Sequence, residues 1–181
     1  TVRIICCEFL RRARASLITA QRRNSKFASV PTNSSVQALP MSDRRRSSAA
    51  LTAATAKALY DHWALLYDCE ILDWGYTAHT EVARMLAAAG YGSHARVLDL
   101  ACGTGLSAVA LHDAGIGTTG GIVGVDISEK SLDVAEKKGV FVECIPHDLE
   151  KPLPFGDTLF DAVICVAAAS CVEDFGVHLG E

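Results

Sequence analysis

Hydrophobic positions recur with a helical period over two stretches that begin about 50 residues into the chain. In residues 49–67, Leu59, Trp63 and Leu66 follow one another at spacings of four and three, which is the spacing of one helix face. Residues 77–89 repeat apolar side chains in the same way, and a glycine follows as a typical helix stop. The pattern therefore predicts two helices ahead of the rest of the domain.

Beyond residue 95 the pattern changes to short apolar runs that alternate with helical stretches. Buried strands are predicted at 96–101, 121–127, 140–145 and 160–167, and helices at 106–113 and 131–138. Strands that alternate with helices form parallel sheets, because a parallel neighbour is reached through a helical crossover. We therefore predict an α/β fold: a doubly wound, mostly parallel, Rossmann-like sheet with helices on both faces.

Charge divides the chain into two parts. The formal net charge is −4, but residues 1–48 carry ten basic and two acidic side chains, or +8, which leaves −12 for the remainder. An acidic body argues against a nucleic-acid-binding face on the folded part, because phosphate contacts need clustered Lys and Arg. No apolar run reaches the roughly 18 residues of a membrane-spanning helix, so no membrane role is expected.

The chain is accordingly divided near residue 50. Residues 1–50 are predicted to be a disordered basic leader, and residues 51–181 the folded domain. The leader resembles an organellar transit peptide in its Arg and Ser content, but Met41 begins an ordinary-looking start, so a functionless translated leader remains the alternative.

The seven cysteines show no CxxC pair and no zinc-like spacing. Reduced thiols in an intracellular protein, cytoplasmic or organellar, are expected, with no metal site.

The sequence VLDLACGTG carries the sharpest chemical signal. Asp99 closes a predicted strand just before Gly103 and Gly105, and glycines let the backbone approach a ligand where strand turns into helix. The turn also matches a GxGxxA dinucleotide pattern. However, a carboxylate here would repel a pyrophosphate and attract the ammonium and sulfonium groups of S-adenosylmethionine. We therefore favour S-adenosylmethionine as the cofactor; alternatively, Asp99 only caps the turn.

Two further acids follow the next two strands. Asp126 ends the second strand, where it is placed to accept both ribose hydroxyls of a nucleoside. Asp148 follows the third strand and is placed to accept from the exocyclic amine of adenine, with Ile127 and Leu149 covering the ring faces. Ser128 is expected either to share in this site or simply to cap the next helix.

VLDLACGTG, GVDIS, HDLEKPLPF and FDAVIC, in this order and spacing, resemble the successive sheet motifs of class I S-adenosylmethionine-dependent methyltransferases. YDHWALLYD followed by Tyr76 further resembles the Williams-Beuren syndrome chromosome region methyltransferase-like proteins. The resemblance covers roughly residues 58–181 and implies strand order 3-2-1-4-5-7-6. It also implies that Tyr67 and Tyr76 lie near the cofactor's entrance. The candidate cofactor-binding residues are Tyr67, Tyr76, Asp99, Ala101, Cys102, Gly103, Gly105, Asp126, Ile127, His147, Asp148 and Leu149.

Two features depart from the family pattern. Residues 115–121 form a long, glycine-rich link, which predicts a mobile surface loop. The sequence also stops soon after the fourth predicted strand, so a sheet truncated there, with that strand as an uncovered edge, is expected.

The expected function is methyl transfer to an unidentified, small-molecule acceptor, with no catalytic residue assigned and no protein partner predicted. The alternatives are a non-catalytic, truncated methyltransferase-like binding module and a nicotinamide-dependent oxidoreductase.

Overall fold

Two helices precede the sheet, as the pattern predicts. The computed structural model describes residues 3–6, 52–155 and 159–168. Helix α2 spans Ala53–Asp73 and helix α3 spans Ala78–Ala88. The Thr52 side chain caps α2 by accepting from the backbone N–H of Thr55. Helix α2 runs six residues beyond its predicted end, because no glycine or proline interrupts the chain before Gly75.

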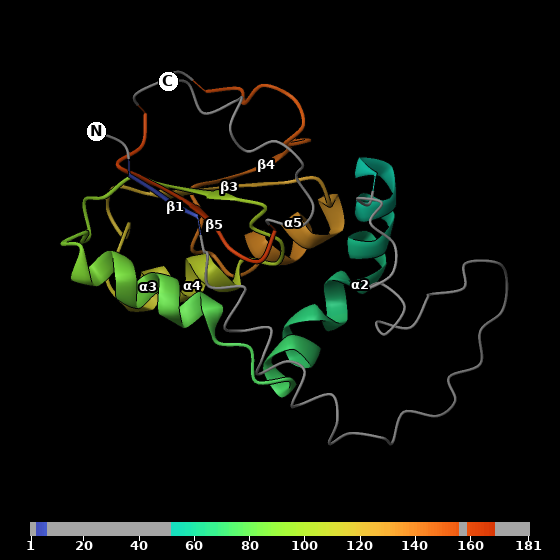
Figure 1. The fold of residues 1–181 in the computed structure, drawn as a ribbon, viewed down its shortest axis with the longest axis horizontal. Coiled ribbons are helices and arrows are strands. Elements are labelled where there is room, and N and C mark those ends of the chain that lie inside the picture. The colour runs from blue at the N-terminus through green and yellow to red at the C-terminus, as the bar shows by residue number, and fades with distance from the viewer. Residues whose placement is uncertain (1–2, 7–51, 156–158, 169–181) are drawn as a thin grey trace, which may run out of the picture.

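The strands form one parallel sheet in the order β1-β5-β2-β3-β4 (Figure 1). The elements after α3 are β2 (Val97–Leu100), α4 (Leu106–Asp113), β3 (Ile122–Asp126), α5 (Glu129–Glu136), β4 (Glu143–Pro146) and β5 (Ala162–Cys165). Counted in the order of the predicted strands, β4-β3-β2-β5 is 3-2-1-4, which confirms the implied order for these four. The prediction of a Rossmann-like α/β sheet is also confirmed.

The edge beside β5 differs from the expectation. Strand β1 (Arg3–Cys6) pairs in parallel with β5, from Arg3 opposite Ala162 to Cys6 opposite Cys165. The prediction that the fourth strand is an uncovered edge is therefore wrong, and these four residues of the expected leader belong to the sheet. Two of the four are isoleucines, which favour strands. Residues 1–2 and 7–51 lie outside the described residues, so the rest of the leader assignment stays a prediction.

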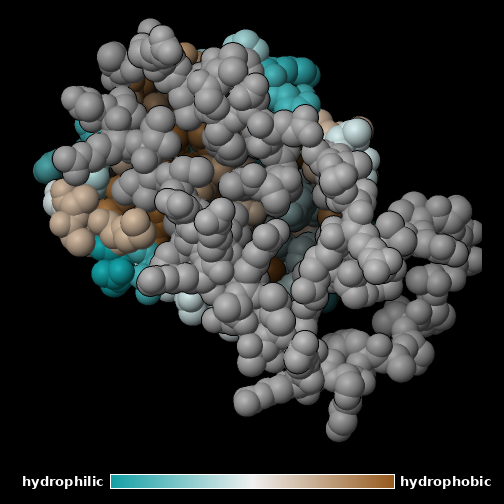
Figure 2. All heavy atoms as spheres, viewed as in Figure 1, coloured by the Kyte–Doolittle hydropathy of each residue, from teal (hydrophilic) through white to brown (hydrophobic). Residues whose placement is uncertain are grey.

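The two faces of the sheet bury separate apolar clusters. On one face, Val97, Ile122 and Ile164 pack with residues of α3 and α4, and these two helices lie side by side beneath the sheet (Figure 1). On the other face, Leu98 and Val125 belong to a cluster completed by side chains from the loop around residues 149–155. Within the described residues, helices thus cover the first face, whereas loop side chains cover the second. The helices predicted on both faces are therefore found on one face only among these residues. Figure 2 shows apolar atoms toward the middle of the sheet region and hydrophilic atoms at its rim.

The glycine-rich link before β3 is tightly bonded, so the prediction of a mobile loop is wrong. The backbone N–H groups of Gly117, Thr119 and Gly120 donate to the carbonyl groups of Gly92 and Ser93. A Cβ atom at Gly120 would lie 2.2 Å from the carbonyl oxygen of His94. The glycines therefore allow a close backbone approach rather than motion.

A carboxylate also anchors the start of β5. Asp161 accepts a hydrogen bond of 2.8 Å from the backbone N–H of Arg96, which ties the start of β5 to the residue before β2. No helix in the described part of the chain is long and apolar enough to cross a membrane.

Candidate functional site

A pocket lies at the edge of the sheet where β2, β3 and β5 end. Parallel strands point their carboxyl ends to the same edge, so the loops that follow them meet there. Seven of the predicted residues line this pocket: Tyr67, Ala101, Gly103, Asp126, Ile127, Asp148 and Leu149. The structure thus brings together residues from three separate loops and from α2, as the resemblance implies. That they hold a cofactor stays a prediction.

The turn after β2 has a left-handed backbone at three positions. Ala101, Gly103 and Gly105 have φ values of 53°, 54° and 88°. A Cβ atom on Gly103 would meet nothing within 4 Å, so this glycine faces open space in the pocket. For Ala101, a left-handed backbone is unfavourable because of its Cβ, and such strain concentrates at functional sites.

Gly105 has a different role from Gly103. A Cβ atom at Gly105 would lie 2.7 Å from the ring of Phe141, and one at Gly124 would lie equally close to the same ring. Phe141 therefore packs over both glycines, behind the turn. Gly105 begins α4 but does not line the pocket, so its predicted contact with a cofactor has no support in this geometry.

Asp126 is the most strongly organised acid of the pocket. One carboxylate oxygen accepts from the backbone N–H of Gly103 (2.7 Å), and the other accepts from that of Ser128 (2.8 Å). Burial raises the pKa of Asp126, and the hydrogen bonds from Ser128 and Gly103 oppose that rise. The backbone of Ile127 also donates to this carboxylate. A carboxylate offers about four acceptor sites, so the side chain remains able to accept from a hydroxyl of a ligand in the pocket.

Asp99 lies behind the pocket rather than on its surface. Its side chain is 1% exposed, and its Oδ2 atom has no hydrogen-bond partner among the described residues. Burial, and then the negative charge of Asp126, hold the pKa of Asp99 well above its ordinary value. The geometry brings Asp99 close to the site but does not place it on the pocket wall.

Asp148 lines the pocket beyond β4. Its carboxylate accepts from the backbone N–H of Glu150 (3.1 Å), and Lys151 lies 3.6 Å away. These contacts lie within the loop, so Asp148 is placed by its own neighbours rather than by the sheet. Leu149 from the same loop and Ile127 from the loop after β3 also line the pocket, in agreement with the predicted apolar cover.

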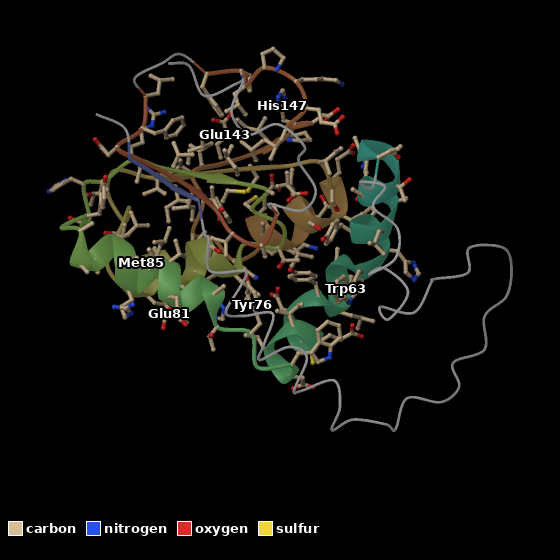
Figure 3. The ribbon with its side chains drawn as sticks, in the orientation of Figure 1. Trp63, Tyr76, Glu81, Met85, Glu143 and His147 are labelled. Carbon is tan, nitrogen blue, oxygen red and sulfur yellow. The ribbon has the colours of Figure 1, made fainter. Side chains whose placement is uncertain are left out.

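Three other predicted residues do not line the pocket. Cys102 is buried, and burial raises the pKa of its thiol well above the ordinary value. Tyr76 stacks on His79 with ring centroids 5.5 Å apart. His147 follows β4, and its ring nitrogen lies 3.4 Å from the carbonyl oxygen of Lys151. Tyr76 and His147 lie well apart in Figure 3. Of the two tyrosines that the resemblance places near the entrance, Tyr67 lines the pocket and Tyr76 does not.

Two walls of the pocket were missed by sequence reasoning. One is the face of α2 that carries Ala53, Ala56 and Tyr60, and the other is the segment Val166–Ala167–Ala168 after β5. Small apolar residues give no distinctive pattern, and only the left-handed φ of Ala167, 66°, marks that segment as unusual. Thr104, Ser131 and Glu150 complete the lining.

Ser128 accepts a hydrogen bond from the backbone N–H of Ser131 and caps α5, in agreement with the alternative that it caps the next helix.

The described residues contain no cluster of His, Cys, Asp and Glu that could hold a metal ion. The described cysteines, Cys69, Cys102, Cys144 and Cys165, are free.

Residues 97–178 match a model of the family described as "Methyltransferase domain". Demethylmenaquinone methyltransferase from Staphylococcus aureus is 35% identical over 100 residues, which are 54% of this chain and 41% of that protein. The chain therefore spans about two fifths of the length of the curated relatives it matches.

Solved structures with a similar fold include two methyltransferases. Magnesium protoporphyrin IX methyltransferase from Synechocystis with bound SAH is 29% identical, over 48% of this chain and 39% of that one, with a TM-score of 0.38. A putative S-adenosylmethionine-dependent methyltransferase from Methanococcus maripaludis is 15% identical, over 72% and 57%, with a TM-score of 0.49.

These findings confirm the resemblance to class I S-adenosylmethionine-dependent methyltransferases at the level of the domain. The finer resemblance to the Williams-Beuren syndrome chromosome region methyltransferase-like proteins stays a prediction.

Proposed function

We propose that this chain supplies the cofactor-binding part of an S-adenosylmethionine-dependent methyltransferase whose acceptor is a small molecule with an apolar surface. The observation that carries the proposal is the meeting of Gly103, Asp126 and Asp148, from the loops after β2, β3 and β4, in one pocket. A nucleoside-type donor needs a close backbone approach, a bidentate acceptor for its ribose and an acceptor for its base.

The residues of the pocket fit this cofactor. Gly103 leaves open space that a Cβ atom would fill, and Asp126 lines the same pocket. The carboxyl groups of Asp126 and Asp148 both line the pocket, so a diphosphate placed there would be repelled. A donor with an ammonium and a sulfonium group is electrostatically favoured. When bound, it supplies a methyl group already activated by the positive sulfur.

The apolar walls support a small, apolar acceptor. Tyr60 and Tyr67 from α2 and Val166 and Ala168 after β5 line the same pocket as the three loops. The two named relatives carry demethylmenaquinone and magnesium protoporphyrin IX in their names, and both are small molecules. In this proposal the protein mainly aligns acceptor and donor, and alignment can supply about 7 to 11 kcal/mol of a reaction barrier.

The proposal is tested by calorimetry of S-adenosylmethionine binding to the complete protein. Asp126→Ala is expected to weaken binding by roughly 1.5 to 3 kcal/mol, the range for hydrogen bonds to charged groups. Asp133→Ala is the matched control, because Asp133 is an exposed acid of α5 that pairs with Lys130 at the surface. It should bind as the wild type does.

Because Asp126 also holds two backbone N–H groups, Asp126→Asn and Asp148→Ala are measured beside it, with circular dichroism to establish folding. Unchanged affinity in folded variants at both positions refutes the assignment of the site. Saturable binding of NADH without binding of the methyl donor favours an oxidoreductase instead, and binding of neither favours a non-catalytic module.

A further inference from the structure

Two aspartates of α2 bond to hydroxyl groups in the loops that form the pocket. Asp61 accepts a hydrogen bond of 2.7 Å from the Ser128 hydroxyl, and Asp68 accepts one from the Thr104 hydroxyl. Both hydroxyl-bearing residues are almost fully buried, at 0% and 2% exposure. A buried hydroxyl needs a partner, so both loops depend on α2 for it.

The spacing of these aspartates follows from helix geometry. Seven residues make about two turns at 3.6 residues per turn, so Asp61 and Asp68 lie on the same face of α2. Tyr60 and Tyr67 have the same spacing, are offset by one residue and line the pocket. The YDHWALLYD segment is thus a two-turn repeat in which each tyrosine lines the pocket and the following aspartate bonds to a loop.

The two loops are those that carry the candidate cofactor-binding residues. Thr104 lies between Gly103 and Gly105 in the turn after β2. Ser128 lies two residues after Asp126 and donates its own backbone N–H to that carboxylate. Each aspartate of α2 therefore contacts a residue within two positions of a proposed cofactor contact.

Each aspartate also has a lysine partner. Lys57 lies 3.0 Å from the Asp61 carboxylate, and Lys138, just beyond α5, pairs with Asp68. The backbone N–H of Lys130 adds a third hydrogen bond to Asp61, at 3.3 Å. Paired charges tolerate partial burial, which allows these carboxylates to lie between α2 and the loops.

Apolar packing contributes little to the position of α2. Of its 21 residues, only Ala56, Ala64 and Ile71 are buried, and two of these are small. Since burial energy grows with apolar area, three such residues anchor a long helix weakly. Larger apolar side chains of α2, among them Leu59 and Trp63, are only half-buried. The polar contacts at Asp61 and Asp68 therefore add directed constraints on where the helix lies along the pocket.

We propose that Asp61 and Asp68 are positioning residues that fix the tyrosine-bearing wall of α2 against the two loops that hold the methyl donor. They act through Ser128 and Thr104 and do not touch the donor themselves. This inference rests on the proposed function, and it adds a role for the two acids of the YDHWALLYD segment.

The two tryptophans of the chain make the test direct. Trp63 lies within α2 and Trp74 is its C-cap, so within this chain tryptophan fluorescence reports on this helix. Trp63 projects from α2 in Figure 3. Acrylamide quenching is measured in the complete protein with and without S-adenosylmethionine, beside calorimetric donor affinity and thermal unfolding followed by circular dichroism.

Asp61→Ala and Asp68→Ala are each expected to weaken donor binding about tenfold and to increase quenching, with the unfolding of the sheet little changed. Asp73→Ala is the matched control, because Asp73 is an exposed acid at the end of the same helix, outside the pocket lining. It should leave both quantities as in the wild type. Asp68→Asn keeps an acceptor for Thr104 but loses the charge opposite Lys138, and it should fall between wild type and Asp68→Ala.

A double-mutant cycle with Asp68→Ala and Thr104→Val separates this role from a general loss of stability. If Asp68 acts through the Thr104 hydroxyl, the double variant should bind the donor no more than about tenfold more weakly than wild type, rather than with the product of the two losses.

The inference is overturned if the losses of donor affinity in Asp68→Ala and Thr104→Val multiply in the double variant. It is also overturned if Asp61→Ala and Asp68→Ala bind the donor and are quenched as the wild type is. If the wild type binds no donor, the proposed function fails, but quenching without donor still tests whether these acids hold α2. Quenching equal to wild type in both variants then overturns the positioning role separately.

Discussion

The sheet and helix α2 are held in place by different kinds of contact. All residues of β2, β3 and β5 are buried, and their side chains form the two apolar clusters. Helix α2 buries three side chains and leaves Leu65, Leu66 and Leu72 exposed by 84%, 59% and 47%. The sheet is therefore stabilised by apolar burial, whereas α2 is positioned by a few directed polar bonds.

This difference bears on how the pocket is built. Its floor comes from loops fixed by the sheet, and one wall comes from a helix that the sheet does not fix. A change in the apolar core should thus alter global stability, whereas a change at the α2 contacts should alter the pocket first.

The largest effect is expected from a core truncation in the sheet. Ile164 is fully buried in β5, between β1 and β2, and Ile164→Ala should lower the free energy of unfolding by about 2 to 5 kcal/mol. Leu65→Ala, on the exposed side of α2, should stay within about 0.5 kcal/mol of wild type. Urea denaturation of both variants checks the contrast. A large loss in Leu65→Ala would mean that this side of α2 is covered in the complete protein.

An intermediate effect is expected at Asp99, where a substitution should raise rather than lower the free energy of unfolding. Its pKa is raised in the folded protein by burial and by the charge of Asp126, so wild-type stability falls as the pH rises above the ordinary value of 3.8. Asp99→Asn removes the ionisation and should stabilise the protein at pH 7 by about 0.5 to 2 kcal/mol, as at other functional-site residues. Unfolding is compared at pH 4 and pH 7. An equal effect of the variant at both values would contradict the raised pKa of Asp99.

A smaller effect is expected when Asp61 is protonated. Burial works to raise its pKa, but hydrogen bonds from Ser128, Lys57 and the backbone of Lys130 outweigh it and lower the pKa below 3.8. The stabilisation of α2 by Asp61 should be complete above pH 3.8 and lost as the pH falls through the lower folded value. Its size should stay below about 1 kcal/mol, since the contact is partly exposed.

Tryptophan quenching followed from pH 6 down to pH 2 measures this loss. In Asp61→Asn the corresponding rise in quenching should be absent. A wild-type rise that persists unchanged in the variant would assign the transition to another acid.

The smallest effect concerns the left-handed alanine after β5. Ala167 has φ 66°, and Ala167→Gly relieves its Cβ strain but adds freedom to the unfolded chain. A net gain of about 0.5 kcal/mol in unfolding free energy is expected. Ala168→Gly, at a position without positive φ, should instead destabilise the protein. Calorimetric unfolding distinguishes the two, and a loss in both would show that the strain is not relieved.

Much of the fold was predictable because its signals are local. The strand at Val97–Leu100 and its glycine turn are visible in the sequence, since a buried strand is a short apolar run, here interrupted only by Asp99. The end of α2 was predicted too early, although its stop signal, Gly75, is local. The pairing of Arg3–Cys6 was not predictable, because it does not depend on a local pattern. A strand of four residues pairs only if a distant edge is available. The fixed loop before β3 was missed for a similar reason, since its glycines are explained by the backbone of residues 92–95.

The candidate site was predictable in its acids and less so in its walls. Asp126 and Asp148 follow predicted strands, so parallel topology alone brings them to one edge. Asp99 was expected in the same place. However, side chains alternate along β2, so the Asp99 side chain lies on the same face of the sheet as Val97, the face covered by helices. Ala53, Tyr60 and Ala167 carry no chemical signature, and only packing reveals them.

By itself the sequence determined four of the strands, the positions of the three acids and the resemblance to methyltransferases, because apolar periodicity and strand-end motifs are properties of short segments. The order of those four strands followed from the resemblance. The tertiary structure decided which of these acids faces the pocket, how β1 closes one edge of the sheet and where α2 lies. Those outcomes depend on contacts between residues 23 to 159 positions apart, such as Gly103 with Asp126, Lys138 with Asp68 and Arg3 with Ala162. No local pattern encodes such pairs, since their geometry exists only once the sheet has formed.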